Sequence, residues 1–360
     1  MDEYLKQCAV VNPHLELHYR VRLKKNGGEA EDLENGEEVR RGAALPSDEA
    51  EDGWTTFQRV SRKLPEAPRE IKPHPHGVEL GALMEMLKST SARTLRAALE
   101  QDFARVSARA ADEICRRAGL NPRSGPGRIA RQESEALYKA IGDTKLMRPP
   151  TDCLSPIGEE QMIAGLKKEI DADFYTAVSR FPAVYRGNPF LIEAGAAVGR
   201  PGNGGPGAED PIRLMRFANR VPLLHMAGAC AITKAATAVN WKSYGFAQPR
   251  GGLPLGPAVV LVHVASVWVP FTSESKEAVA HYPEIMREIT FALQECGRRL
   301  AVHVKRQQRR AERERKRKYI AAYIPHLALG LQEILGLSER QKSAVVRSLN
   351  DMLEKTQLEK

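Results

Sequence analysis

AVVLVHVASVWV, residues 258–269, is the stretch that decides the fold of this 360-residue chain. It is rich in valine, and apolar residues would lie on both faces of a strand formed by it. Pro270 follows directly. Because such a strand must be covered on both faces, the stretch predicts the central strand of a buried sheet. His263 within it is predicted to be a hydrogen-bonded core residue rather than a metal ligand.

The segments before this strand predict more of the same sheet. Residues 190–198 and 212–221 predict strands, and the glycine-rich sequence 199–207 between them predicts a hairpin or a flexible insertion. That loop is not a phosphate-binding loop, because it lacks a final GK followed by Ser or Thr and no helix follows it directly. The alanine-rich segment 225–239 predicts a helix slim enough to pack on a sheet.

A long helix is predicted to begin at Pro283, since proline is well tolerated in the first helical turn. One apolar stripe follows it, formed by Ile285, Ile289, Leu293, Cys296, Leu300 and Val304. Beyond Val304 the stripe is replaced by charge: residues 305–318 hold nine basic and two acidic side chains. A helix unbroken to Lys318 would have about 36 residues and a length of roughly 54 Å. It therefore starts on a sheet and ends as a basic arm, and the apolar pattern that resumes over 319–337 needs a partner surface.

The first 90 residues predict little compact structure. Residues 9–23 alternate like a half-buried strand that has no obvious partner. Between Glu29 and Asp52 there are ten acidic and two basic residues, which predicts a solvated linker. Prolines over 61–77 predict an extended linker; His74 and His76 there could suggest a metal pair, but a docking segment is favoured because no third ligand is in view.

Residues 80–168 predict helices. One helix carries apolar residues from Leu95 to Ile114 and ends at Gly119, a second runs over about 128–141, and a third over about 159–170. Turns at Asn121-Pro122 and Gly125-Pro126-Gly127 separate the first two. The basic side chains of this module indicate either a solvated helical face or nucleic-acid contact, and they are Arg105, Arg109, Arg123, Arg128 and Arg131.

Composition limits the function classes. With 54 Lys and Arg against 45 Asp and Glu, the net charge of +9 favours an anionic partner, nucleic acid first and membrane surface second. No apolar run is long enough to span a membrane, and the acidic N-terminus lacks the pattern of a signal peptide. The five cysteines are scattered and never spaced as CxxC, which excludes a disulfide framework and a zinc site and indicates a reducing compartment. No catalytic triad, P-loop or metal-ligand spacing is evident.

Two short segments carry candidate chemistry. The polar segment Thr272-Ser273-Glu274-Ser275-Lys276 lies between the central strand and the long helix. Lys276 is placed to reach a phosphate held by another domain, although spacing alone favours an ordinary exposed loop lysine. The segment Trp241-Lys242-Ser243-Tyr244 sets a cation between two aromatic residues, which fits a nucleic-acid contact or a packed strand edge equally.

The region around the central strand resembles the transducer domain of the DNA topoisomerase VI B subunit, from the type IIB topoisomerases. The resemblance rests on VLVHVASVWVPFTSESKEAVAHYPEI (260–285), RFANRVPLL (216–224), GACAITKA (228–235), WKSYGFAQPRGGLPLGPA (241–258) and ALQECGRRL (292–300). FARVSARAADEICRRAGL (103–120) and PPTDCLSPIGEE (149–160) resemble the family's helix-two-turns-helix domain, and IKPHPHGVELG (71–81) resembles the linker before it.

The resemblance implies an α+β chain: an all-helical helix-two-turns-helix domain, then an α/β transducer with a ribosomal-protein-like fold, a left-handed crossover and a long C-terminal helix. The domains implied are 1–23, the remnant of the last strand of an ATPase domain; 24–60, an acidic linker or insertion; 61–87, a Pro-rich linker; 88–170, the helix-two-turns-helix domain; 171–318, the transducer with its stalk helix; and 319–360, a helical tail that docks the A subunit. The family assembles as an A2B2 heterotetramer with the DNA-cleaving A subunit.

The departure from the family is as informative as the match. Family members begin with an ATP-binding domain, and its Glu/Asn helix, DxGxG motif and Gly-rich lid do not occur here; only VVNPHLELHY (10–19) resembles its last strand. ATP and Mg²⁺ would therefore be bound by a domain supplied in cis or in trans, and this chain alone should bind no cofactor and hydrolyse no ATP. By the resemblance, Lys276 is the switch lysine that reaches the γ-phosphate.

The expected function is part of an ATP-dependent type II topoisomerase that acts on double-stranded DNA, is cytoplasmic and nucleoid-associated, and has no membrane partner. Candidate DNA contacts, by resemblance and charge, are Trp241, Lys242, Tyr244, Arg298, Arg299, Lys305, Arg306, Arg109, Arg123 and Arg128. The alternative is a non-enzymatic adaptor that binds DNA or the A subunit without an ATP step. A DNA glycosylase with the same helical module is disfavoured, since residue 2 is Asp and no zinc finger follows.

Overall fold

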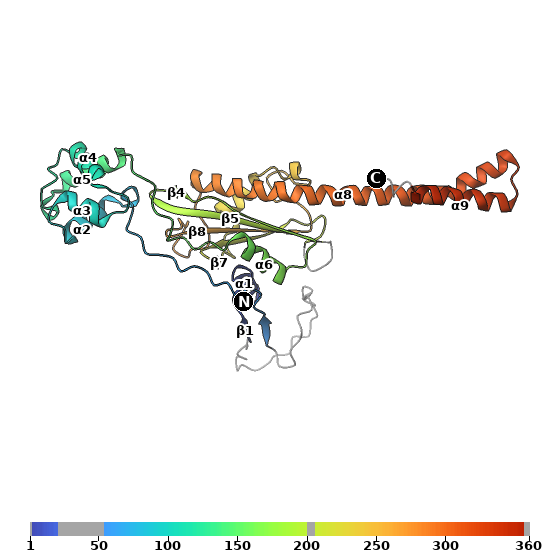
Figure 1. The fold of residues 1–360 in the computed structure, drawn as a ribbon, viewed down its shortest axis with the longest axis horizontal. Helices are drawn as coiled ribbons and strands as arrows, with labels where there is room; N and C mark the ends of the chain where they lie inside the picture. Colours follow the sequence, from blue (N-terminus) through green and yellow to red (C-terminus); the bar gives the residue numbers. More distant parts are fainter. Residues whose placement is uncertain (1, 21–53, 200–205, 356–360) are drawn as a thin grey trace, which may run out of the picture. The chain divides into compact units, whose positions relative to one another are not determined.

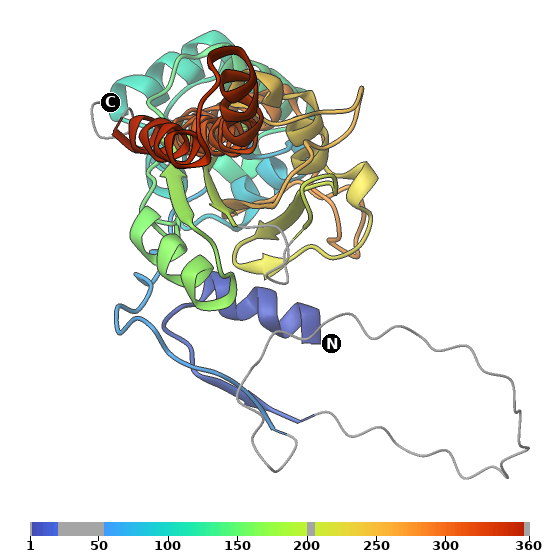
Figure 2. The same ribbon diagram turned by 90° about the vertical axis from the view of Figure 1, so that its right-hand side faces the viewer.

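The computed structural model describes residues 2–20, 54–199 and 206–355 of the chain. It divides into two compact units, Met1–Leu300 and Ala301–Lys360. The acidic segment 29–52 and most of the glycine-rich loop 199–207 lie outside the described residues. Figures 1 and 2 draw the chain from two directions.

The first unit is built on a mixed six-stranded sheet with β8 (Ala258–Ser266) at its centre. The strands lie in the order β3-β5-β8-β6-β7, where β8 is antiparallel to β5 and parallel to β6. Every residue of β8 is buried, which confirms the prediction of a central strand. The other strands are β3 (Phe174–Ser179), β4 (Ala183–Tyr185, paired with the start of β5), β5 (Asn188–Val198), β6 (Arg213–Ala218) and β7 (Val221–Pro222).

Two predictions about this sheet need correction. The hairpin between β5 and β6 is wrong, because β8 lies between them and pairs with both. The helix predicted over 225–239 is shorter: a 3-10 turn η3 (Ala227–Ala229) precedes α7 (Ala231–Ala238), and η4 (Trp241–Tyr244) follows it. Met226 has a φ of 49°, which is incompatible with a right-handed helix and delays its start.

Helices cover both faces of the sheet, as the central strand requires. In Figure 1, α6 (Glu159–Glu169) and α1 (Asp2–Val11) lie against one face, and the first turns of α8 (Pro283–Leu335) lie against the other. Met162 and Leu166 of α6 share a buried cluster with Phe217 and Leu261 of the sheet. On the other side, Cys296 of α8 is fully buried with its Sγ 3.3 Å from the carbonyl oxygen of Ala194.

The N-terminal segment differs from the strand predicted over 9–23. Ala9, Val10 and Val11 end α1 and are buried, so contacts with α6 override their local preference for a strand. Only β1 (Leu17–Tyr19) is extended, and its partner is β2 (Thr55–Phe57), inside the segment 24–60 predicted as an acidic linker. The rings of Tyr19 and Phe57 stack with their centroids 6.1 Å apart. The partner of β1 is thus formed by the β-forming residues that follow the acidic sequence.

Gly165 allows α1 to approach α6. A Cβ atom added there would lie 1.8 Å from the carbonyl oxygen of Val10. We expect Gly165→Ala to lower the free energy of unfolding by about 1–3 kcal/mol, because the helices must separate. Gly142→Ala in α5 is the matched control, since its Cβ would meet nothing within 4 Å. Urea denaturation that gives equal stabilities for the two variants would contradict this packing.

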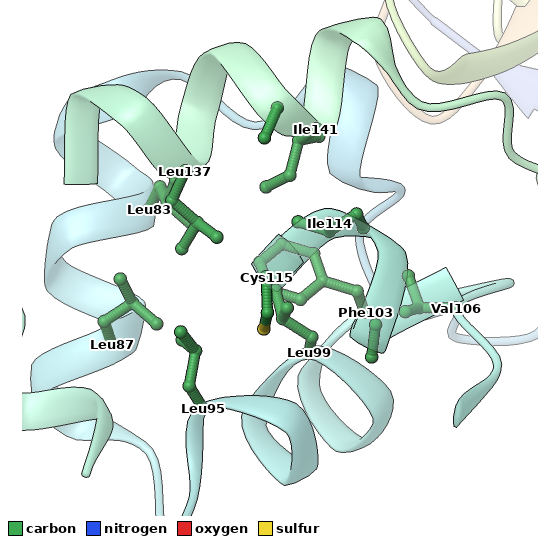
Figure 3. Close-up of a cluster of buried hydrophobic side chains, with 12 residues drawn as sticks. Leu83, Leu87, Leu95, Leu99, Phe103, Val106, Ile114, Cys115, Leu137 and Ile141 are labelled. Carbon is green, nitrogen blue, oxygen red and sulfur yellow. The ribbon is translucent and has the colours of Figure 1, made fainter. Parts of the chain in front are cut away.

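The helical part of the first unit has its own core, drawn in Figure 3. Its helices are α2 (Leu80–Ser89), α3 (Leu95–Asp102), α4 (Ala108–Ala118) and α5 (Arg131–Asp143). Leu83 and Leu87 of α2 lie in this core, so the linker predicted over 61–87 ends before Leu80. Figure 3 also shows Leu137 and Ile141 of α5 contributing to the same cluster.

The single helix predicted from Leu95 to Gly119 is broken in the middle. Arg105 has a φ of 62°, and the Ser107 side chain accepts a hydrogen bond from the N–H of Ala110 to start α4 anew. Phe103 nevertheless stays in the core, which is why its spacing fitted one continuous stripe. Gly119, with a φ of 69°, caps α4 as predicted.

The prolines of 61–77 precede η1 (Pro75–Gly77), where both histidines bind backbone rather than metal. The Nε2 of His74 donates to the carbonyl oxygen of Met147, and the Nε2 of His76 to that of Ile141. No group of three metal-ligating side chains occurs among the described residues. These hydrogen bonds to the backbone of Met147 and Ile141 favour the interpretation of a segment that docks on the helical part.

The second unit consists of the rest of α8 and of α9 (Glu339–Lys355). With 53 residues, α8 continues beyond Lys318 through the apolar residues that follow it. Gly336, with a φ of 63°, allows the chain to turn between the two helices. An apolar groove of about 620 Å³ lies between them and is lined by Tyr319, Ile320, Tyr323, Ile324, Leu327, Leu349, Met352 and Leu353.

Candidate functional site

Lys276 lies in an exposed loop that connects β8 to α8. Phe271 and Val279 form an isolated antiparallel bridge that closes the loop, and the N–H of Thr272 donates to the carbonyl oxygen of Ala278 at 2.9 Å. Lys276 has a φ of 55°, and its side chain makes no hydrogen bond or ion pair among the described residues. Its ammonium is therefore free to meet a ligand that approaches from outside.

The base of this loop is fixed to the sheet unit. Ala278 and Val279 are fully buried, and the carbonyl oxygen of Val279 accepts a hydrogen bond from the N–H of Ala231 at the start of α7. Pro283, the first residue of α8, follows a few residues later in the chain. A force on the exposed tip of the loop would thus act on α7 and on the beginning of α8.

Trp241 is a core residue, which corrects its place among the predicted DNA contacts. Its exposed fraction is 1 %, and its Nε1 donates to the carbonyl oxygen of Ala236 at 2.8 Å. The indole also meets the rings of Tyr244 and Phe246 edge to face. The segment 241–244 therefore uses its first aromatic residue for packing, because the indole fills space behind α7.

Tyr244 of η4 packs on α8 beside the candidate Arg298. The ring of Tyr244 covers Gly297: a Cβ atom added to Gly297 would lie 2.4 Å from the Cδ2 of Tyr244. Lys242 beside it is exposed and has no side-chain partner among the described residues. Arg298 follows Gly297 and is 59 % exposed, with its guanidinium held by Glu295.

Arg299 has a structural task that sequence reasoning missed. Its Nη1 donates to Glu159 of α6 at 3.1 Å and to the carbonyl oxygen of Ala177 on β3. Glu159 in turn accepts the N–H of Ser179 at 3.0 Å. The pair thus occupies free backbone groups of an edge strand, which protects that edge from pairing with another chain.

The remaining basic candidates are exposed. Lys305 and Arg306 lie on α8 in the second unit. In the helical part, Arg109 lies in the first turn of α4, Arg123 in the connection from α4 to α5, and Arg128 in η2 (Pro126–Arg128). None of these five has a side-chain ion pair among the described residues, in contrast to Arg116 and Arg117, which pair with Glu113.

A buried carboxylate–imidazole pair lies at the centre of the sheet. Glu193 of β5 and His263 of β8 are both fully buried, with Oε2 and Nδ1 2.9 Å apart. The prediction that His263 is a satisfied core residue is confirmed, whereas Glu193 was missed. Its signal was a single acidic residue in the otherwise apolar stretch FLIEAGAAV. A charge in such a position is rarely accidental, because burial without partners would be very costly.

Known proteins match this chain over most of its length. The family model described as "Topoisomerase VI B subunit, transducer" matches residues 149–316. The B subunit of type 2 DNA topoisomerase 6 from Archaeoglobus fulgidus is 42 % identical over 333 residues, which cover 92 % of this chain and 50 % of that protein. The chain belongs to the family of topoisomerase VI B subunits.

Other relatives agree. The corresponding B subunit from Methanosarcina acetivorans is 42 % identical over 92 % of this chain and 48 % of its own length. That from Halobacterium salinarum is 48 % identical over 51 % of this chain and 23 % of its own length. Among solved structures, the B subunit of DNA gyrase from Myxococcus xanthus is 22 % identical and covers 33 % of this chain and 32 % of that one. Its TM-score of 0.22 is too low to support an argument.

This homologue of the topoisomerase VI B subunit spans about half the length of the curated relatives it matches. Its transducer match begins before α6, so α6 belongs with the sheet and not with the helical module predicted over 88–170. The physical reason is that the apolar side of α6 is buried on the sheet. In the described part of the chain, no helix is both long and apolar enough to cross a membrane.

Proposed function

We propose that this chain is the helix-two-turns-helix and transducer portion of a type IIB topoisomerase B subunit, which passes nucleotide state to a DNA-cleaving A subunit. The observation that carries the proposal is that one transducer match holds both the exposed Lys276 loop and α8 as far as residue 316. Since the loop leads directly into the start of α8, an input at Lys276 would reach the first turns of that helix. The transducer's ribosomal-protein-like topology is part of the same proposal.

Lys276 would act on a nucleotide held elsewhere. ATP and Mg²⁺ would be bound by an ATPase domain in cis or in trans, because the motifs of such a site do not occur in this sequence. The ammonium of Lys276 would stabilise negative charge on the terminal phosphate. A change in the position of the loop between nucleotide states would then reach α7 and α8 through the buried base of the loop. This chain alone would hydrolyse no ATP.

Double-stranded DNA is the proposed partner of the basic residues. Lys242 lies in η4, whose Tyr244 packs on α8 at Gly297, next to Arg298 in the sequence, and Lys305 and Arg306 continue the basic sequence of α8. Arg109, Arg123 and Arg128 of the helical part are a second proposed group. Trp241 is no longer included, because its side chain is buried. Arg299 is left out as well, because its guanidinium joins α8 to Glu159 and to the backbone of β3, whereas the side-chain partner of Arg298 is Glu295 on its own helix. Such a role would place the protein in the cytoplasm, associated with the nucleoid.

The test of DNA contact is the salt dependence of binding. Each lost phosphate contact should reduce the slope of log affinity against log salt by about 0.9. We therefore expect Lys242→Ala with Arg298→Ala to weaken binding and reduce the slope by about 2. Lys145→Ala, an exposed basic residue outside the proposed contacts, controls for net charge. Unchanged affinity and slope in the double variant would exclude this assignment.

The A subunit is the proposed occupant of the groove between α8 and α9. Tyr319, Ile320 and Tyr323 on its wall are exposed apolar or aromatic side chains, as expected of a docking surface. An A2B2 heterotetramer would cover them. The alternative is an adaptor that binds DNA or the A subunit without an ATP step. ATP dependence of DNA relaxation by the reconstituted complex separates the two functions.

A further inference from the structure

Arg220 occupies a backbone position that favours glycine. It lies with Asn219 in the two-residue turn between β6 and β7, where the φ angles are 45° at Asn219 and 65° at Arg220. Turns of this kind prefer Asn-Gly, because a side chain at positive φ is strained. Asn219 fixes the turn by exchanging two hydrogen bonds with the backbone of Ser266. An arginine at the second position therefore needs a reason.

The side chain of Arg220 supplies that reason by joining two distant segments. Its Nη1 donates to the carbonyl oxygen of Val11 at 2.8 Å, at the end of α1. Its Nη2 donates to the carbonyl oxygen of Pro156 at 2.9 Å, just before α6. The guanidinium thus stands at the negative end of the α1 dipole and links it to the segment that enters α6.

Glu193 and His263 complete the connection from the other side. The carboxylate of Glu193 accepts the N–H groups of Ile157 at 2.7 Å and of Gly158 at 2.8 Å, at the positive end of α6. The Nε2 of His263 accepts the N–H of Arg220 at 3.0 Å, so its Nδ1 carries the proton donated to Glu193. The imidazole thus links the carboxylate at the start of α6 to the backbone of Arg220, whose guanidinium lies at the end of α1.

We propose that Arg220, His263 and Glu193 form a junction that couples α1 to the entry of α6, with Arg220 as its positioning residue. The tight packing of α1 on α6 at Gly165 is consistent with the two helices moving together. The coupling is a property of the chain itself and does not depend on the proposed function. In a B subunit it would carry a displacement of the N-terminal segment to the sheet and to the helical part.

Hydrogen exchange of the full chain tests the junction. Arg220→Gly suits the backbone of the turn and leaves the Glu193–His263 pair in place. If Arg220 mattered only for the turn, this variant would lose no protection from exchange. We expect the amides of Val11, Asn12, Ile157 and Gly158 to exchange about tenfold faster or more, because two hydrogen bonds to a charged group are lost. Arg220→Lys should restore part of the protection. Wild-type rates at these amides in Arg220→Gly would overturn the proposal, as would equal acceleration throughout β8.

A second variant distinguishes coupling from local capping. Glu193→Gln touches the entry of α6 directly but not α1, and we expect it to accelerate exchange at Val11 and Asn12 as well. Glu159→Gln is the matched control: it lies in the first turn of α6 and contacts β3 and Arg299 instead. It should leave Val11 and Asn12 unchanged. If Glu193→Gln affected only α6, or if the control affected α1 equally, no such junction would exist.

Discussion

Replacing Glu193 with alanine is expected to lower the free energy of unfolding of the first unit by about 3–5 kcal/mol, because several buried donors lose a charged acceptor at a cost of about 1–3 kcal/mol each. The change leaves four donors without an acceptor: the N–H groups of Ile157 and Gly158, the Ser179 hydroxyl and the His263 Nδ1. Urea denaturation followed by tryptophan fluorescence measures it. All three tryptophans, Trp54, Trp241 and Trp268, lie in the first unit.

Glu193→Gln keeps the shape of the side chain and is the matched control for volume. Its amide can still accept a hydrogen bond, so its loss of stability should be smaller than that of alanine. A loss below about 1 kcal/mol for Glu193→Ala would contradict the view that this carboxylate organises the start of α6.

The same residue predicts a pH dependence. Burial by itself raises the pKa of Glu193, but hydrogen bonds from His263, the N–H of Ile157 and Ser179 hold that pKa below its ordinary value. A lowered pKa in the folded state means that the contribution is present above the ordinary value of about 4.3 and is lost as pH falls through the folded pKa. The stability difference between wild type and Glu193→Gln should therefore narrow below about pH 4. A difference that grows with acid would contradict this sign.

Lys276→Ala is expected to reduce ATP-dependent DNA relaxation by about tenfold to hundredfold, as measured in a complex with the A subunit and an ATPase domain. The estimate is the cost of losing one hydrogen bond to a charged group, about 1.5–3 kcal/mol. DNA binding should be unchanged, because the loop lies apart from η4 in the sequence. Glu274→Ala in the same exposed loop is the control, and Lys276→Arg should retain part of the activity. Wild-type relaxation by Lys276→Ala would refute the switch role.

Local signals in the sequence predicted the parts of the fold that depend on local chemistry. The valine-rich run gave a central strand at β8, Gly119 a helix end and Pro283 a helix start. The errors concern contacts between distant segments. The insertion of β8 between β5 and β6 has no local signature, and α1 is helical because it packs on α6.

The candidate site shows the same division. Lys242 and Lys276 are exposed, as their polar surroundings suggested. The segment around Trp241 fitted packing and DNA contact equally, and the structure shows that the indole is buried. The composition around Arg299 gave no sign of its partner at Glu159. Glu193 could have been found from its place in an apolar strand. Its link to Arg220 could not, because that link joins residues from separate strands and a turn.

The central proposal is that this chain connects an ATPase domain, supplied in cis or in trans, to the DNA-cleaving A subunit. Relaxation of supercoiled DNA by a mixture of this chain, the A subunit and the ATPase domain tests it most directly. We predict relaxation only when all three proteins and ATP are present. Relaxation at the same rate without this chain, or without ATP, would contradict the claim.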